Sequence, residues 1–412
     1  MDAVTKWVYI DKIIERTVEE REGGRTLLKR IDDLTLNPYI NLGVTFVILY
    51  LIFESFIRIG HVFLTERVIG RYIFAPGTGY DRWLHQTFEG TPLFEILVGD
   101  TAQGYLSSFG LLTTGLYVPF GVVLPSILIF YLWLTLLEDI GYLPRVAILA
   151  ERLFARIGLP GTSIIPTILG LGCNVPGVIA SRMLETQKER FILSNLLAIA
   201  VPCNAQISIA LVVIGGVFGA EYLIIILAVL ILLYLILGVF LKRTVAGECP
   251  ELILEVPPCR MVHLGSFMMK MHLRMRAFLF DAVPWVLAGV LLVNLLYLTG
   301  VLQLLEDTMA PILTLWFGIP PEMVGALIVG FLRKDVAIAL LHFIPDLGVW
   351  QAITGVIILM IYFPCAATFV MLFKEQGVVN TLKSTALMIM VALIAGGVLN
   401  AARIIFGWVS HG

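Results

Sequence analysis

The sequence predicts an all-α polytopic membrane protein made of two pseudo-symmetric inverted repeats, with amphipathic interfacial helices. Its mean hydropathy is +0.94. Of the 412 residues, 59% are hydrophobic and 14% are charged, against roughly 25% charged in soluble domains. Several apolar runs reach the ~20 residues that cross a bilayer as a helix. Two apolar regions are interrupted by glycine and polar residues, and each precedes a proline-broken span, which is the sequence pattern of a transporter.

Charge and cysteine content exclude several other classes. A net charge of −2 with basic residues in local clusters offers no nucleic-acid surface. Five cysteines without a C-x-x-C pair form neither a disulfide framework nor a structural zinc site. The sequence contains no G-x-x-x-x-G-K-[ST] loop and no nucleophile–base pair, so we expect a transporter that is not an enzyme and binds no nucleotide.

The first third of the chain is expected to bring it into the membrane. Residues 1–37 are highly charged and predict cytoplasmic amphipathic helices that connect to the first span. Residues 38–140 are expected to hold spans at about 39–60 and 111–137, around an extracytoplasmic segment at 65–100 with aromatic anchors. The second span ends in the carboxylates Glu138 and Asp139, which fit a solvated helix end or a metal vestibule equally well.

Residues 141–243 are expected to form the first repeat. Leu169–Gly177 breaks an apolar run at Gly170, Gly172 and Pro176. Unpaired backbone groups at membrane depth cost several kcal/mol each, so such a break survives only where protein covers it or where it lines a pathway. We therefore expect a re-entrant hairpin at 163–182, followed by a span at 191–217 that is broken at Pro202 and by a span at 222–241.

Residues 244–280 are expected to form a cytoplasmic basic loop and an interfacial helix. Lys242, Arg243 and the cations that follow place this loop on the cytoplasmic side by the positive-inside rule. Four methionines at 268–275 alternate with those cations, which favours a basic amphipathic helix over a metal-handling strip.

Residues 281–412 are expected to form the second repeat, with apolar segments at about 282–305, 324–343, 353–373 and 387–408. Its hairpin begins at Gly330 and contains the adjacent charges Arg333, Lys334 and Asp335, and its following span is broken at Pro364. Inverted topology is a hypothesis: the first hairpin enters from the cytoplasm and the second from outside. A cytoplasmic turn between Lys374 and Lys383 then places the C-terminus outside.

The helix breaks carry a set of side chains that suits a transition metal. In this arrangement the pathway residues converge near the midplane: Cys173, Asn174, Cys203, Asn204, Gln206, Cys365, Thr368 and Asp335. Soft sulfur with amide oxygen suits Fe²⁺, Zn²⁺ or Co²⁺ better than Mg²⁺ or Ca²⁺. A lone cysteine is more often a small buried hydrophobe, but matched Pro-Cys contexts reverse that preference. Arg333 and Lys334 fit an electrostatic gate or an internal salt bridge.

These motifs resemble the membrane domain, which contains the Gate regions, of FeoB-type ferrous iron transporters. The matching stretches are Leu136–Arg145, Gly170–Pro176, Pro202-Cys203, Pro257–Arg260, Gly330–Leu341, Pro364–Thr368 and the connector Thr26–Pro38. The resemblance implies multi-pass insertion in the cytoplasmic membrane of a prokaryote, Fe²⁺ as the transported ion, and Cys173 as a pathway ligand. It also implies a homo-oligomer and a small SH3-like accessory protein.

The sequence departs from the family in one respect, because the GTPase domain of the family has no counterpart in it. A separate G protein that docks on the cytoplasmic side and a trimmed chain both remain open. Gate regions are also similar to those of concentrative nucleoside transporters, so a small-solute carrier is an alternative, and a non-transporting scaffold is a third. A nucleoside carrier should offer acidic and amide pairs with aromatic stacking near the breaks, whereas these breaks carry cysteine.

Overall fold

The computed structural model describes residues 38–74, 78–88, 94–98, 110–219, 221–247, 262–284, 287–288, 291, 295, 299–330, 334–341, 344 and 347–410. All regular elements among these residues are helical, which confirms the predicted all-α class. By length and composition, four helices of the described chain can cross a membrane: Tyr39–Gly70, Gln187–Gly215, Glu221–Thr244 and Val349–Ile405. The predicted connector at 1–37 lies outside the described residues.

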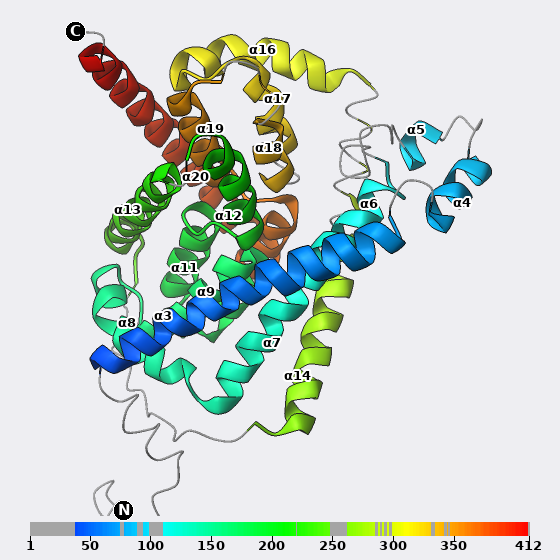
Figure 1. Ribbon diagram of the computed structural model, residues 1–412. Coiled ribbons are helices and arrows are strands. Elements are labelled where there is room, and N and C mark those ends of the chain that lie inside the picture. Colours follow the sequence, from blue (N-terminus) through cyan, green and yellow to red (C-terminus); the bar gives the residue numbers. More distant parts are fainter. Residues whose placement is uncertain are drawn as a thin grey trace, which may run out of the picture.

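The first span is longer than the sequence predicts. Helix α3 (Pro38–Ser55) continues without a gap into the π-helix η1 (Phe56–Gly70), and Figure 1 shows the two as one long rod. Beyond it, the short helices α4 (Gly79–Phe88) and α5 (Phe94–Leu97) surround a small apolar cluster that includes Phe74 and Leu84. This cluster lies within the segment predicted to carry aromatic anchors.

The second membrane region bends sharply after Ile140. It consists of α6 (Thr114–Leu116), η2 (Tyr117–Val123), α7 (Leu124–Ile140) and α8 (Leu143–Arg156). Residues Ile127–Ile140 and Leu143–Arg156 meet at 94°. Gly141 adopts a left-handed conformation (φ 82°), and Pro144 lies in the first turn of α8. A glycine at φ > 0 followed by a proline ends one helix and starts the next, which explains the bend.

The first repeat contains the predicted hairpin and the predicted broken span. After η3 (Gly161–Ser163), the hairpin arms are α9 (Ile164–Gly172) and α10 (Asn174–Ala180), which pack on each other. A Cβ atom on Gly177 would lie 3.0 Å from the Cα of Gly170, so glycine lets the two arms approach closely. The turn η4 (Ser181–Met183) leads to the broken span, which comprises α11 (Gln187–Ile199), α12 (Asn204–Ala210) and η5 (Leu211–Gly215), and then to α13 (Glu221–Thr244).

The second repeat has the same order of elements. Its hairpin arms are α17 (Glu322–Gly330) and α18 (Lys334–Leu340), and α19 (Val349–Ile361) is followed after a break by α20 (Ala366–Ser410). One hairpin arm of each repeat packs on the broken span of the other repeat. Arm α10 of the first repeat packs on α20, and arm α18 of the second packs on α12. The turn predicted between Lys374 and Lys383 is made within α20 by one non-helical residue, Gly377 (φ 74°, ψ 172°). There Glu375 forms an ion pair with Arg182 of the first repeat, at 2.5 Å.

Two helices lie beside the repeats. Helix α14 (Leu264–Ala277) continues into η6 (Phe278–Ala282) and packs against α7. Helix α16 (Val301–Phe317) lies across one end of the molecule in Figure 1, packed on α17 and α20. The sequence did not predict α16 as a separate helix, because its first residues were assigned to a span at 282–305. Part of that span, including 285–286, 289–290, 292–294 and 296–298, lies outside the described residues.

The core is built around α11 and α19. In α11 the side chains of Ile192, Leu193 and Leu196 are fully buried, and in α19 every residue of the run Ala352–Ile361 is buried. A helix that is apolar all round, as α19 nearly is, belongs in a protein core or a membrane span, and here the whole run Ala352–Ile361 is covered by other parts of the protein. Because both broken spans begin with these central helices, their Pro-Cys breaks are held in the interior of the protein.

Candidate metal pathway

Three cysteines mark the ends of interrupted helices. Cys173 separates α9 from α10 in an extended conformation (φ −153°, ψ 131°). Cys203 directly precedes α12, also extended (φ −75°, ψ 162°), and Cys365 directly precedes α20. None of these three cysteines forms a disulfide, and all three are partly buried. The helix breaks predicted at these positions are therefore present, and each break presents one thiol.

The fold brings Cys203 and Cys365, which are distant in the sequence, within electrostatic range of Cys173. Cys173 interacts electrostatically with Cys203 and with Cys365. The buried Lys334 interacts in the same way with Cys365 and Cys203. We refer to Cys173, Cys203, Cys365 and Lys334 as the cysteine cluster. Its members come from both repeats, so neither repeat contains the cluster alone.

The amide side chains beside the cluster differ in how their polar atoms are paired. Asn174 is buried, and its Oδ1 has no hydrogen-bond partner among the described residues. Gln206 accepts a hydrogen bond from the Cys203 N–H through Oε1 (2.8 Å), while its Nε2 is buried without a partner in the described chain. Asn204 accepts a hydrogen bond from the Ser208 hydroxyl at 3.4 Å. Asn174 therefore offers a buried oxygen that is open to a ligand, whereas Gln206 already uses its oxygen to cap α12.

Cys365 and Thr368 are in direct contact, with Sγ and Oγ1 3.1 Å apart. Thr368 is buried within the first turn of α20. This is the arrangement of a residue before a helix and a hydroxyl three positions later, so the contact follows from helix geometry. It places a hard oxygen beside a soft sulfur.

Helix ends set the electrostatic environment of the cluster. Helices α10, α12 and α20 begin directly after the three cysteines, and α18 begins at Lys334. The exposed N–H groups at a helix N-terminus carry partial positive charge and favour a nearby thiolate. Burial opposes this, because a charged group loses its hydration. Helix N-termini and burial thus act in opposite directions on the thiols. This suits a site in which the thiols become fully charged only when a cation binds.

The two charged side chains that flank Lys334 in the second hairpin are outside the part of the chain that the structure describes. Arg333 lies outside the described residues, as does the side chain of Asp335. The internal salt bridge expected from the sequence therefore stays a prediction. Gly330 ends α17, where a Cβ atom would lie 2.9 Å from the Tyr362 hydroxyl oxygen, so this break also requires a small residue.

Two tyrosines near the cluster were not identified from the sequence. Tyr362 interacts electrostatically with Cys365, and its hydroxyl donates a hydrogen bond to the Leu327 carbonyl at 2.6 Å. Tyr131 on α7 interacts with Cys173. The position of Tyr362 three residues before Cys365 was a usable signal, but Tyr131 lies in an ordinary apolar helix and carried none.

The cysteines do not form a closed cage. Among the residues that the structure describes, no three His, Cys, Asp or Glu side chains group as a metal-holding set. Any ion at the cluster would need amide, hydroxyl or backbone oxygens beside sulfur. Such mixed, incomplete coordination binds a metal ion more weakly than a thiolate cage does. A transport site requires this weaker binding, because the ion must leave again.

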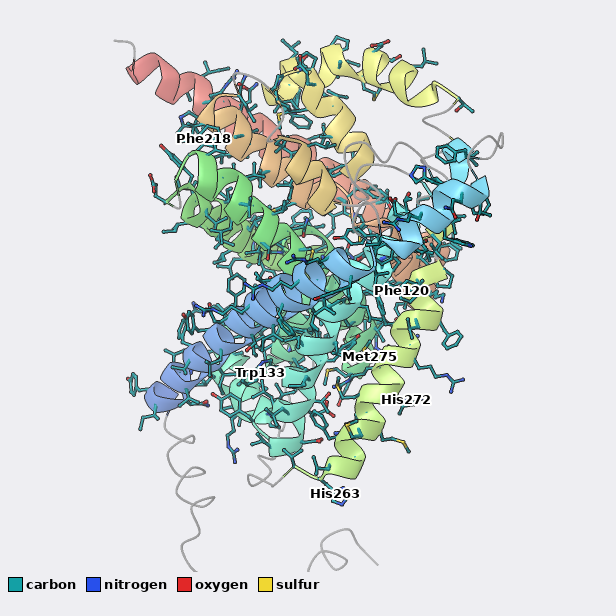
Figure 2. The ribbon with its side chains drawn as sticks, turned by 45° about the vertical axis from the view of Figure 1, so that its right-hand side comes forward. Phe120, Trp133, Phe218, His263, His272 and Met275 are labelled. Atoms are coloured by element: carbon teal, nitrogen blue, oxygen red, sulfur yellow. The ribbon has the colours of Figure 1, made fainter. Side chains whose placement is uncertain are left out.

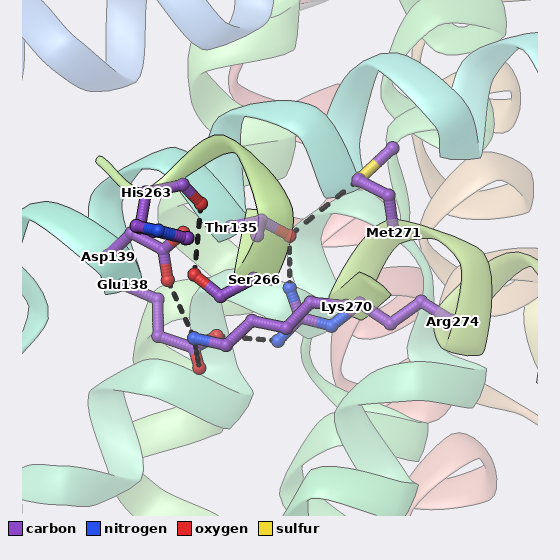
Figure 3. Close-up of polar contacts among 8 residues, drawn as sticks. All are labelled: Thr135, Glu138, Asp139, His263, Ser266, Lys270, Met271 and Arg274. Carbon is purple, nitrogen blue, oxygen red and sulfur yellow. Dashed lines mark hydrogen bonds and ion pairs between the residues drawn. The ribbon is translucent and has the colours of Figure 1, made fainter. Parts of the chain in front are cut away.

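The predicted vestibule carboxylates are engaged by basic side chains of α14. Lys270 Nζ lies 2.9 Å from Glu138 Oε1 and 2.6 Å from Asp139 Oδ1, and Arg274 Nη2 lies 2.6 Å from Glu138 Oε2. Arg274 also donates to the Thr135 hydroxyl, as Figure 3 shows. Hydrogen bonds to Asp139 and then Glu138 raise the pKa of Lys270 above its ordinary 10.5. The carboxylates thus fasten α14 to the end of α7.

The methionines of α14 lie on different sides of the helix. Met271 and Met275 pack against the apolar cluster of α7, where Trp133 also lies, whereas Met268 and Met269 are exposed. Figure 2 shows Met275, His272 and His263 along this helix. The four sulfur atoms therefore do not form one continuous strip.

Breaking the contact between α7 and α14 is expected to have a measurable but small cost. K270M and D139N, singly and together, should show a coupling energy of about 1 kcal/mol in a double-mutant cycle, because Lys270 is partly exposed to solvent. Since the Lys270 pKa is raised, this contribution is complete below the ordinary lysine pKa and is lost only as pH rises through the raised value. Thermal unfolding in detergent measures it, and strictly additive effects would contradict the pairing.

Comparison with known proteins places this arrangement in a family. The Gate family, described as nucleoside recognition, matches residues 120–220 and 279–379. The chain is 25% identical, over 95% of its length, to the Fe(2+) transporter FeoB of Staphylococcus aureus strain MSSA476, and it covers 61% of that protein. It is 29% identical, over 62% of its length, to the Fe(2+) transporter FeoB of Salmonella typhimurium strain LT2, of which it covers 32%.

The similarity extends over most of this chain but only part of its relatives. With the FeoB of Staphylococcus aureus strain COL the identity is 26% over 98% of the chain, which covers 62% of that protein. The chain thus spans about three fifths of the length of these Staphylococcus relatives. No solved structure matches it. With a Gate match in each half and similarity to FeoB along most of its length, this chain is a FeoB-like, Gate-containing membrane protein.

Proposed function

We propose that this chain carries Fe²⁺ across the cytoplasmic membrane, into the cytoplasm, through a pathway that contains the cysteine cluster. The observation that supports this most directly is that three helix breaks, contributed by both repeats, each present one thiol within electrostatic range of the Cys173 thiol or at Cys173 itself. Interrupted helices at membrane depth are tolerated where they line a pathway. The Fe(2+) transporters among the relatives make Fe²⁺ the first ion to test.

The ligand chemistry supports a borderline transition metal. Thiolate sulfur prefers Fe²⁺, Co²⁺ and Zn²⁺ to Mg²⁺ and Ca²⁺, and the Asn174 oxygen supplies a neutral harder donor. Asn174, Asn204, Gln206, Thr368 and Asp335 are proposed to complete the coordination in turn as the ion passes. Because amide and hydroxyl oxygens bind these ions weakly, the ion can leave the site.

Ion influx into liposomes tests the proposal. The purified chain is reconstituted without GTP, and a metal-quenched dye inside reports entry of Fe²⁺ under reducing, anaerobic conditions. We expect Fe²⁺ influx well above that of protein-free liposomes, with Zn²⁺, Co²⁺ and Mn²⁺ ranking the selectivity and Mg²⁺ excluded. Uptake of a radiolabelled nucleoside is the contrasting arm, prompted by the description of the Gate family. Nucleoside uptake without metal influx would overturn the proposal.

A further inference from the structure

Lys334 is a buried lysine at the edge of the cysteine cluster. The residue is 5% exposed, and its Nζ donates a hydrogen bond to the Met360 carbonyl oxygen at 2.6 Å. Met360 lies at the end of α19, just before the break that carries Cys365. An ammonium group buried this deeply is costly unless negative charge compensates it. The groups around Lys334 therefore decide whether its positive charge is compensated.

The described groups that face Lys334 are thiols. Its electrostatic partners are Cys365 and Cys203. Helix α18 packs against α12, α17 and α19. Helices α12 and α19 contain no charged residue, and Glu322 of α17 is exposed. Within the described side chains, the two thiols are thus the groups that can supply negative charge to the buried ammonium.

We propose that Lys334 is a tethered cation that takes the place of the transported ion beside Cys203 and Cys365 when the site is empty, and weakens the hold of the site on that ion when it is bound. This inference rests on the proposed Fe²⁺ transport. A divalent ion and an ammonium group in a low-dielectric interior repel each other strongly. The hydrogen bond to the Met360 carbonyl oxygen holds the ammonium group beside the break that carries Cys365, and the flexible lysine stem lets it move away from the thiols as the ion enters. Because the ammonium group and the ion compete for the same thiols, the ion is bound less tightly and can be released.

Co²⁺ binding tests this directly, because Co²⁺ bound to thiolate absorbs in the near ultraviolet. The full chain in detergent is titrated with Co²⁺ under reducing, anaerobic conditions. In K334M the Kd for Co²⁺ is expected to fall about tenfold, because the competing charge is gone. K334R keeps the charge and should bind as the unmodified chain does. K383M removes an exposed lysine instead and serves as the matched control.

Influx supplies the second measurement. K334M is expected to slow Fe²⁺ influx about tenfold while it binds Co²⁺ more tightly, and K334R should restore the rate. A purely structural role would weaken binding and influx together. K334Q and the melting temperature of each variant separate this effect from misfolding. Unchanged or weaker Co²⁺ binding in well-folded K334M and K334Q overturns the role of Lys334.

The same experiments separate the two proposals. If the unmodified chain neither passes Fe²⁺ nor shows the thiolate–Co²⁺ band, the proposed function fails. If it does both, and the neutral variants at position 334 keep its Kd and its rate, only the inference about Lys334 fails.

Discussion

Replacing Cys173 with serine is expected to lower Fe²⁺ influx at least about tenfold, because a soft thiolate ligand becomes a neutral hydroxyl. Cys173 lies between the two arms of the first hairpin and interacts with both other cysteines, so it occupies the shared position of the cluster. The substitution is close in volume and should leave the hairpin folded. Cys203→Ser and Cys365→Ser should also lower influx.

The matched control for these substitutions is Cys259→Ser, which makes the same chemical change in the hydrophilic segment 244–280. Influx should then remain at the level of the unmodified chain. Binding of Co²⁺, followed by its thiolate absorption, should decline in the same order as influx. Undiminished Fe²⁺ influx in both Cys173→Ser and Cys203→Ser would refute the assignment of these residues as ligands.

Adding a side chain at Gly177 is expected to destabilise the first hairpin. A Cβ atom there would lie 3.0 Å from the Cα and the N of Gly170 and 3.0 Å from the Pro166 carbonyl oxygen. These are backbone atoms, so the arms α9 and α10 would have to separate. Gly177→Ala should cost about 1–3 kcal/mol, and Gly177→Val should cost more, as overpacking does in closely packed interiors.

Gly216→Ala is the control for this prediction. Gly216 is helical, and a Cβ atom there would meet nothing within 4 Å, so the change should be neutral or slightly stabilising. Melting temperatures of the two alanine variants in the same detergent measure the difference. Equal stability of Gly177→Ala and Gly216→Ala would mean that the arms of the hairpin do not require their close approach.

Much of the fold follows from local properties of the sequence. Apolar length predicts the membrane spans, and glycine and proline predict where helices stop, because both effects depend on a few neighbouring residues. The breaks at Cys173, Cys203 and Cys365 were predicted for this reason. The turn between Lys374 and Lys383 was predicted as well, although a single residue, Gly377, makes it.

Pairing between distant residues did not follow from such local signals. Glu138 and Asp139 fitted a metal vestibule as well as a solvated end, and their partners lie on α14, more than 100 residues away. Tyr131 lies in an ordinary apolar helix until the fold brings it to Cys173. Helix α16 was hidden because an apolar run does not say whether a helix crosses the membrane or lies along one end of the molecule.

The sequence by itself determined the membrane class, the two repeats and the breaks at Cys173, Cys203 and Cys365, since hydropathy and backbone propensity act locally, although the predicted break residues Gly170 and Pro176 lie within α9 and α10. Only the tertiary structure decided that a hairpin arm of each repeat packs on the broken span of the other, that Cys203 and Cys365 lie within electrostatic range of Cys173, and that Lys334 is buried near them. The physical reason is that helix packing depends on which face of each helix meets a partner distant in sequence. In a chain that is apolar on nearly every face, the order of residues leaves that choice open.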